Sequence, residues 1–238
     1  MTGLSEFRVR LYEPRDRPAV RALCCDTGFL GSPIDPVFQD RDLFADFFTD
    51  YYLRCEPDSA FVVETEAGLQ GYLLGARYPL RHQLFSLQQA AMLAAKMLTR
   101  FSGYNQATRN YFAWILRNSW KEVPSAPRHV GHFHINLLPQ ARSIRVCREL
   151  LNTYLAFLYR SGVKQISAQF VTFEDRRSVQ MLERYGFRVI NQSRISKFQR
   201  YTDKPIYLST IAKDLTLHPD GRVLYPTREQ KPMVSHHG

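Results

Sequence analysis

Apolar and polar residues alternate at the start of the chain, and the pattern then changes to a helical spacing. Residues 7–12 read FRVRLY, and this alternation of apolar with basic side chains predicts a strand with one buried face. Residues 16–23 and 40–54 instead carry apolar side chains three or four positions apart, which predicts two helices. The Gly- and Pro-containing stretch 28–36 between them predicts a loop.

The middle of the chain combines a predicted hairpin with a long helical stretch. Two short β-rich runs, 60–64 and 70–77, flank a Glu-Ala-Gly segment and predict a β-hairpin. Helical periodicity then begins at residue 81 and breaks at 102–103, so two helices are expected within 81–120. The apolar residues of the first of these helices fall on one face: Leu84, Leu87, Ala91, Ala94, Leu98 and Phe101.

Strand and helix patterns alternate in the second half of the chain. The predicted elements are strands at 128–138 and 165–172, helices at 142–160 and 176–185, and a terminal pair of strands at 194–201 and 206–215. Together these elements predict a single α/β domain with a mixed sheet over residues 1–217. Residues 218–238 are polar, contain three prolines and predict a flexible tail.

The composition is that of a folded soluble protein, with 238 residues of which 45% are hydrophobic. Its 4 cysteines show neither the paired spacing of a zinc site nor the density of a disulfide scaffold, so a reducing, cytoplasmic environment is expected. The N-terminal residues lack the apolar core of a signal peptide, and the most apolar stretch, 84–101, is interrupted by Gln, Lys and Arg. Secretion and membrane spanning are therefore not expected.

The net charge of +10 is distributed unevenly along the chain. The first 68 residues carry 7 basic and 13 acidic side chains, whereas residues 127–201 carry 13 basic and 4 acidic ones. An anionic ligand is therefore expected to meet the block 128–201. Nucleic-acid binding is an alternative that depends on charge alone, because no nucleic-acid motif accompanies it. The acidic residues within 26–58 are either solvated helix faces or the binding surface of a cationic second partner.

The most specific pattern lies within residues 129–187. It consists of the strand HVGHFHINLL, the turn PQARSIRVC, a helix, a strand, and a second helix that closes on ERYGF. This segment resembles the GNAT superfamily of acyl-CoA-dependent acyltransferases, and the order of elements agrees with that family over residues 7–215. The resemblance implies a mixed, mostly antiparallel central sheet flanked by helices, with a helical insertion between the third and fourth strands. It also implies acetyl-CoA as co-substrate and no metal.

In this family the turn after the fourth strand has the form Arg/Gln-x-x-Gly-x-Gly/Ala, and its backbone N–H groups hold the pyrophosphate of coenzyme A. Aligned on Arg142, the two small positions fall on Arg145 and Cys147, so the loop is a degenerate version of the motif. Arg145 removes the close backbone approach that glycine allows, although its guanidinium can itself bind phosphate. The resemblance implies cofactor contacts from Leu137, Leu138, Arg142, Ser143, Ile144, Arg145, Val146, Cys147, Arg148 and Asp175.

Candidates for catalysis lie on the strand before this turn and on the last helix. His132, His134 and Asn136 share one strand face, which suits a base or water-holding role near the thioester; the alternative is a polar face satisfied by its neighbours. The two histidines have no third ligand at metal-site spacing. The family's thiolate-protonating tyrosine is replaced by Leu182, with Tyr185 close by in sequence. The catalytic candidates are therefore His134, Asn136 and Tyr185.

In the GNAT resemblance the first two helices border the acceptor cleft, which makes Asp46 and Asp50 candidate amine-binding residues. The chain is accordingly expected to transfer an acetyl group from acetyl-CoA to a primary amine, by direct attack in a ternary complex. The alternative is a catalytically inactive GNAT-like module that binds a ligand or a protein. The insertion 81–120 either covers the acceptor site or mediates self-association, and a homodimer is one of the open arrangements.

Overall fold

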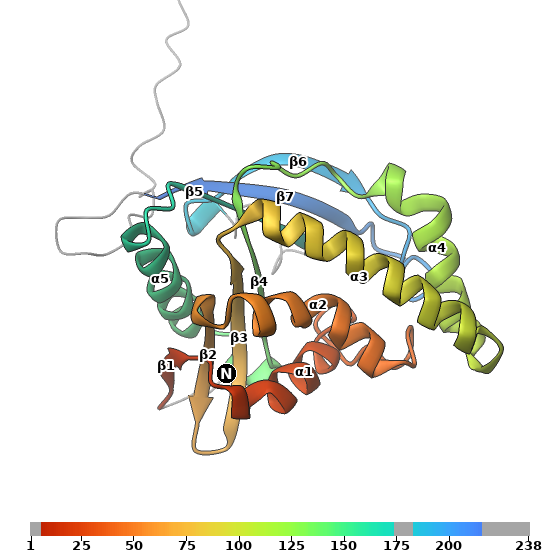
Figure 1. The fold of residues 1–238 in the computed structure, drawn as a ribbon, viewed down its shortest axis with the longest axis horizontal. Helices are drawn as coiled ribbons and strands as arrows, with labels where there is room; N and C mark the ends of the chain where they lie inside the picture. Colours follow the sequence, from red (N-terminus) through yellow and green to blue (C-terminus); the bar gives the residue numbers. More distant parts are fainter. Residues whose placement is uncertain (1–5, 174–182, 216–238) are drawn as a thin grey trace, which may run out of the picture.

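The computed structural model describes residues 6–173 and 183–215, in which seven strands form one sheet that is flanked by helices (Figure 1). The strands are β1 (Arg8–Leu11), β2 (Ala60–Thr65), β3 (Gly68–Ala76), β4 (Gly131–Leu137), β5 (Gln165–Thr172), β6 (Arg188–Arg194) and β7 (Tyr207–Asp214). The α-helices are α1 (Arg17–Asp26), α2 (Arg41–Cys55), α3 (Pro79–Arg100), α4 (Gln106–Glu122) and α5 (Ile144–Arg160).

The sheet is mixed and mostly antiparallel, with the strand order β1-β2-β3-β4-β5-β7-β6. Its one parallel pair in the described chain is β4 with β5, and these strands are paired at only two positions, Gly131 with Ile166 and His132 with Ser167. Beyond these positions β4 keeps its pairing with β3, and β5 keeps its pairing with β7. The predicted mixed, mostly antiparallel sheet is confirmed, and it is split in the middle.

Each face of the sheet is covered by its own apolar core. Helices α1, α2, α3 and α4 contribute to the core on one face, and α5 forms the core on the other. The alternation along β4 follows this division, because Phe133, Ile135 and Leu137 pack on the α5 side. His132 and His134 contact Tyr52 and Tyr72, which belong to the core on the opposite side. The sequence prediction that the histidines share one strand face is confirmed.

Helices α3 and α4 occupy the chain between β3 and β4, and they extend beyond the edge of the α1–α2 layer (Figure 1). Phe85 of α3 packs edge-on against Tyr51 of α2, with ring centroids 5.3 Å apart. The Asn105 side chain accepts a hydrogen bond from Thr108 N and so caps α4. Phe112 of α4 then packs edge-on against Phe38, which lies in the loop between α1 and α2.

The strand predicted at 194–201 is wrong, because β6 lies earlier, at Arg188–Arg194. Both faces of β6 are rich in polar residues and the strand lies at the sheet edge, so no apolar alternation marks it. The apolar residues that suggested a strand are instead buried in the connection that follows. Ile195 and Phe198 are 1% and 2% exposed, and Phe198 packs against Phe29 with ring centroids 5.2 Å apart.

The other predicted elements in the described residues agree with the structure to within a few positions. Gly68, at the end of the hairpin turn, has a φ of 98°, a conformation that favours glycine. Most of the helix predicted at 176–185 lies outside the described residues, as do Asp175, Leu182 and the predicted tail. No helix in the two described segments, 6–173 and 183–215, is long and apolar enough to cross a bilayer.

Candidate functional site

The split between β4 and β5 leaves backbone groups at the centre of the sheet. The N–H of Leu138 donates to the carbonyl of Gln70 on the β3 side, at 2.9 Å. Successive residues of a strand direct their backbone groups to opposite edges, so the N–H groups of Ile135 and Leu137 point toward the β5 edge. The described part of β5 does not pair with β4 beyond Ser167. The split therefore has backbone donors on its β4 side.

Arg142 connects the turn after β4 to the loop after α1. Its Nε donates to the carbonyl of Leu137 at 2.9 Å, and its Nη2 donates to the carbonyl of Gly31. Burial lowers the pKa of Arg142 below its ordinary value, yet a guanidinium stays protonated at neutral pH. Both partners are neutral carbonyls, and no carboxylate of the described chain forms an ion pair with this side chain. Its positive charge is therefore not neutralised by a carboxylate within residues 6–173 and 183–215.

The start of α5 adds backbone donors to this charge. Ser143 is the N-cap, and its hydroxyl accepts from the N–H of Val146 at 3.2 Å, while the N–H of Cys147 donates to the Ser143 carbonyl. The N–H groups of Ile144 and Arg145 precede the first helical hydrogen bond, so they have no intrahelical acceptor. Two backbone donors and one guanidinium therefore lie within the turn that leads from β4 into α5.

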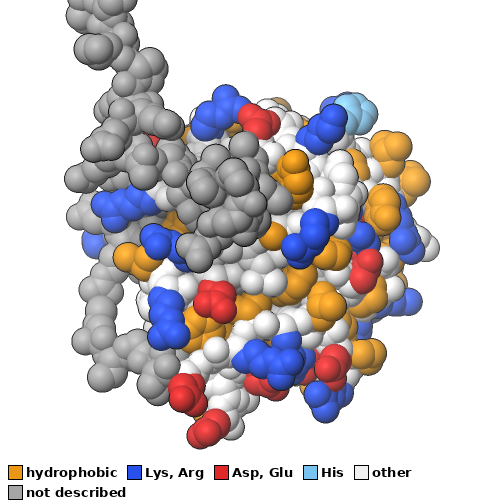
Figure 2. All heavy atoms as spheres, turned by 90° about the vertical axis from the view of Figure 1, so that its left-hand side faces the viewer, with side chains coloured by type: hydrophobic (Ala, Val, Ile, Leu, Met, Phe, Trp, Pro, Cys, Tyr) orange, Lys and Arg blue, Asp and Glu red, His pale blue; other side chains and the backbone are white. Residues whose placement is uncertain are grey.

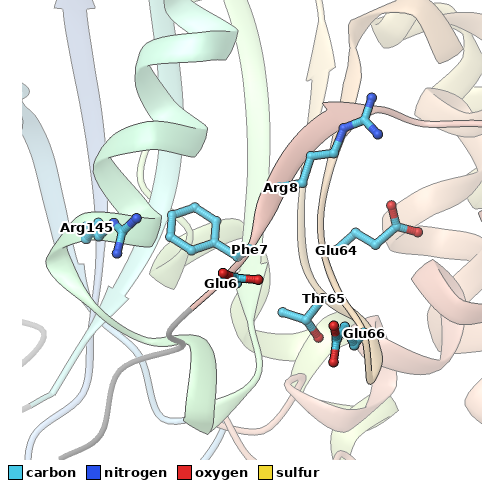
Figure 3. A pocket seen from close by; sticks show the side chains of 7 residues that line it. All are labelled: Glu6, Phe7, Arg8, Glu64, Thr65, Glu66 and Arg145. Carbon is cyan, nitrogen blue, oxygen red and sulfur yellow. The ribbon is translucent and has the colours of Figure 1, made fainter.

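The two residues at the family's small positions have different surroundings. The guanidinium of Arg145 lies over the ring of Phe7, 5.1 Å from its centroid, and borders a surface hollow of about 500 Å³ (Figure 3). Three glutamates also line this hollow, so its lining is not selective for anions. Cys147 is hydrogen-bonded to Tyr185, and burial raises the pKa of its thiol. A thiol with a raised pKa stays protonated at neutral pH and is a poor nucleophile.

His134 belongs to a hydrogen-bonded group on the α1–α2 side of the sheet. Asn136 Nδ2 donates to the hydroxyl of Tyr72 at 2.9 Å, and the same hydroxyl lies 3.5 Å from His134 Nδ1. Burial raises the pKa of the neighbouring Cys24 thiol, so this thiol stays protonated. The Tyr72 hydroxyl can donate to His134 Nδ1 or accept from it, according to the tautomer of the imidazole.

His134 lies in the middle of β4 and is half-buried. Its Nδ1 faces the Tyr72 hydroxyl, and its Nε2 makes no hydrogen bond within the described chain. Because burial lowers its pKa, the imidazole is neutral, and one of its two nitrogens carries a lone pair that can accept a proton.

His132 lies two residues before His134 on the same face of β4 and has a different hydrogen-bond partner. Its Nδ1 lies 2.9 Å from the hydroxyl of Tyr52 on α2, and His82 of α3 stacks on it with ring centroids 5.6 Å apart. Burial lowers the pKa of His132 to about 3 and that of His134 to about 4, and the neighbouring imidazoles lower the value for His132 further. Both imidazoles are therefore neutral at neutral pH.

Several residues of this group could not be found from the sequence. Tyr72, Tyr52 and His82 come from β3, α2 and α3, and no spacing in the sequence relates them to β4. The helical spacing of residues 40–54 predicts a helix there but assigns no site role to Tyr52 or to Phe48, whose ring centroid lies 5.6 Å from that of His134.

The remaining predicted site residues lie apart from the histidines. Asp46 is ion-paired with Arg21 at 2.6 Å and with Lys96 at 3.2 Å, while Asp50 is ion-paired with Arg17 at 2.5 Å. Tyr185 packs against the core on the α5 side, opposite the face that carries His134. The structure therefore brings His134 and Asn136 together, and places Tyr185 beside the start of α5.

The surface in Figure 2 bears on the nucleic-acid alternative. Lys and Arg side chains are interspersed there with acidic and apolar ones, and they do not form a continuous basic band on the described surface in this view. Arg188 is paired with Asp214 at 3.1 Å, so part of the positive charge is already neutralised within the protein. The net charge of +10 thus does not correspond to a basic groove on this face.

No protein-family model matches the chain. Among solved structures, the chain is similar to SsHAT, at 22% identity and a TM-score of 0.55, with 88% of this chain and 98% of that chain covered. It is also similar to a polyamine N-acetyltransferase from Drosophila melanogaster that catalyses the formation of N-acetylagmatine, at 14% identity, a TM-score of 0.54, and coverage of 88% and 100%. A third is yncA from Salmonella typhimurium with its cofactor acetyl-CoA, at 12% identity, a TM-score of 0.50, and coverage of 90% and 96%.

Proposed function

Because the chain has the GNAT acetyltransferase fold, we propose that it transfers an acetyl group from acetyl-CoA to a primary amine. The observation that carries this proposal is the position of His134, a neutral and half-buried imidazole on β4, the strand that borders the split in the sheet. In this proposal a base, a set of backbone donors and an anion site belong to one strand and the turn that follows it. An amine is the proposed acceptor because a structurally similar protein is a polyamine N-acetyltransferase, and attack by a neutral amine requires a group that takes up its proton.

The residues at the start of α5 fit the diphosphate of acetyl-CoA. Arg142 provides a cation with no carboxylate partner in the described chain, and Ile144 and Arg145 provide free backbone donors at the positive end of a helix. Acetyl-CoA, when bound, supplies an acetyl group activated as a thioester. In the split, the N–H groups of Ile135 and Leu137 hold the pantetheine arm and orient the thioester carbonyl.

His134 receives the proton that the amine loses during attack. As the new C–N bond forms, the nitrogen becomes positively charged and strongly acidic, so a weakly basic imidazole is sufficient to accept its proton. The leaving thiolate takes up a proton as the C–S bond breaks. Tyr185 is the candidate donor in this proposal, since it is hydrogen-bonded to Cys147 in the first turn of α5. Asp46 and Asp50 are held in ion pairs, so the proposal does not depend on them.

Two measurements test the proposal. Acetyl-CoA at millimolar concentration is expected to raise the thermal midpoint of unfolding. ADP at the same concentration is expected to give a lower midpoint than acetyl-CoA does. Release of the coenzyme A thiol is then measured with phenethylamine, agmatine and Nα-blocked lysine as acceptors. His134→Ala is expected to lower kcat by about 10²–10⁴ and to leave the acetyl-CoA Kd unchanged.

The control variant is His129→Ala, which removes an exposed imidazole just before β4 and is expected to keep wild-type activity. Absence of acetyl-CoA binding would overturn the proposal. Binding without thiol release for any amine would favour the non-catalytic module. An equal loss of activity in both histidine variants would remove His134 from its proposed role.

A further inference from the structure

Helix α3 carries a row of large apolar side chains on its outer surface. Leu80, Leu84, Leu87 and Leu98 are 63%, 70%, 72% and 74% exposed, and Phe101, directly after the helix, is 45% exposed. Single exposed leucines are common on protein surfaces, whereas a continuous row marks an interaction surface. We call the row 80, 84, 87, 91, 94, 98 and 101 the α3 stripe.

The α3 stripe has the spacing of a helix–helix seam. Its members are separated alternately by four and three residues, which is the seven-residue repeat of a helix that packs along a partner helix. The two positions not occupied by large residues are Ala91 and Ala94, both exposed. At a rise of about 1.5 Å per residue, the stripe runs for about 30 Å. This length matches three heptads of continuous contact.

The α3 stripe faces away from its own domain. The opposite face of α3 contacts α2 through His82, Phe85 and Gln89, and the Gln89 amide donates to the carbonyl of Asp46 at 2.6 Å. On a helix of 3.6 residues per turn these inner positions lie about 180° from the stripe. The attachment of α3 to the domain therefore leaves the stripe uncovered within the described chain.

Charges around the stripe distinguish a helical partner from a lipid surface. An interfacial membrane helix carries Lys and Arg along the borders of its apolar face. Two of the three basic residues of α3, Lys96 and Arg100, are instead ion-paired on the inner side, with Asp46 and Asp40. Most of the bordering positions are uncharged: Gln83, Gln88, Ala90, Ala95 and Met97.

We infer that the α3 stripe binds the α3 stripe of a second copy of this chain, antiparallel, about a two-fold axis at Ala91. A two-fold contact places residue i opposite residue j and residue j opposite residue i, so the fit depends on which side chains are paired. About Ala91 the row pairs Leu84 with Leu98 and Leu80 with Phe101, so large apolar side chains meet at both ends of the contact.

The antiparallel direction follows from how large and small residues meet. With the axis at Ala91, Leu84 packs against Leu98 of the second copy and Leu87 packs over Ala94 of the second copy, so only one layer joins alanine to alanine. A parallel pair would place Leu opposite Leu and leave two successive layers of alanine alone. Facing large and small residues fill the space between helices better. The absence of charges at most bordering positions means that no like-charge contact opposes this arrangement.

Sedimentation equilibrium of the full chain tests the inference. The wild type is expected to sediment at twice the 27.7 kDa chain mass at micromolar concentration. Leu84→Glu with Leu87→Glu is expected to sediment as a monomer, with a dissociation constant raised at least about 100-fold because two charges are buried at the seam. The control is Leu116→Glu on α4, since Leu116 is also 70% exposed but lies outside the stripe. It is expected to remain a dimer.

Cysteine cross-linking tests the direction of the pair without weakening it. Ala91→Cys is expected to form a disulfide-linked dimer under mild oxidation, because the two copies of residue 91 meet at the axis. Leu84→Cys alone is expected not to cross-link, whereas a mixture of Leu84→Cys and Leu98→Cys is expected to do so. Wild type, with its four native cysteines, reports the background.

Three results would overturn the inference. The first is a wild-type chain that stays monomeric at all concentrations. This result would count equally if the monomer co-sedimented with phosphatidylserine vesicles through the stripe. The second is dissociation of the Leu116→Glu control to the same extent as the stripe variant. The third is efficient cross-linking of Leu84→Cys to itself together with failure of Ala91→Cys, which would exclude the antiparallel pair.

Discussion

The Tyr72 hydroxyl on β3 lies 3.5 Å from His134 Nδ1 on β4, and it is the hydrogen-bond partner of this imidazole within the described chain. The same hydroxyl accepts a hydrogen bond from Asn136 Nδ2 at 2.9 Å. Burial raises the pKa of Tyr72 well above its ordinary value, so the phenol stays protonated. Tyr72 on β3 therefore helps to orient His134 on β4.

Tyr72→Phe is expected to lower the rate of acetyl transfer about tenfold while leaving acetyl-CoA binding unchanged. The ring still fills the core, but His134 loses its hydrogen-bond partner at Nδ1, and Asn136 loses its acceptor. Because the Asn136 amide is only half-buried, the loss of unfolding free energy is at most about 1–3 kcal/mol. Steady-state kinetics and urea denaturation measure the two effects.

The matched control is Tyr12→Phe, which removes the hydroxyl of another buried tyrosine that contacts neither histidine in the described structure. It is expected to retain wild-type kinetics. If Tyr72→Phe had full activity, Tyr72 would not position His134, even if His134 itself were essential.

Much of this fold is predictable from the sequence because burial imposes local patterns. The alternation in HFHINL follows directly from one strand face meeting α5 and the other meeting α1 and α2. Strand β6 escapes prediction because an edge strand with polar residues on both faces has no such pattern. Ile195 and Phe198 in the following connection are buried by tertiary contacts, so their apolar character does not mark a strand.

The candidate site is less predictable because it depends on tertiary contacts. His134 and Asn136 can be found from the strand pattern, but Tyr72 is 62 residues from His134 and Tyr52 is 80 residues from His132. The degenerate turn illustrates the same limit. The sequence alone leaves Arg145 as either an obstacle or a phosphate ligand, whereas its contact with Phe7 depends on where β1 lies.

Protein stability is expected to fall as the pH is lowered from about 6.5 to 5. The folded state holds the pKa of His132 at about 3 and that of His134 at about 4, against an ordinary value of 6.5. A base with a lowered folded pKa binds more protons when unfolded, so its contribution is complete above pH 6.5 and is lost as the pH falls toward the folded values. The expected loss by pH 5 is about 1–3 kcal/mol, allowing for the partial exposure of both rings.

Urea denaturation at pH 7, 6 and 5 measures this loss, and His132→Asn with His134→Asn is expected to flatten it. The interval from pH 7 to pH 5 lies above the titration of the carboxylates. Asp16 and Asp40 have ordinary pKa values near 3.8, and the folded state lowers the pKa of both. An unchanged slope in the double variant would show that other groups cause the acid sensitivity.

Arg142→Ala is expected to weaken acetyl-CoA binding about 10- to 100-fold, since hydrogen bonds to charged groups contribute about 1.5–3 kcal/mol. The removed guanidinium is a cation without a carboxylate partner in the described chain, so its loss affects an anionic ligand most. Isothermal titration calorimetry measures the change. Arg160→Ala, at the exposed C-terminal end of α5, is the control for the lost charge and is expected to bind normally. Equal weakening in both variants would indicate only a general electrostatic effect.

Arg145→Gly is expected to leave acetyl-CoA affinity nearly unchanged and to lower the unfolding free energy by about 1–2 kcal/mol. The guanidinium lies over Phe7 at 5.1 Å, so the variant removes a cation–π contact and places glycine in the first turn of α5. Such a contact contributes about 0.5–1 kcal/mol at an exposed site, and glycine costs about 1 kcal/mol relative to alanine. Calorimetric titration and urea denaturation of Arg145→Gly and Arg145→Ala separate the two contributions. A large gain in affinity would mean that the side chain obstructs the diphosphate, and a large loss would mean that it leaves Phe7 to bind phosphate.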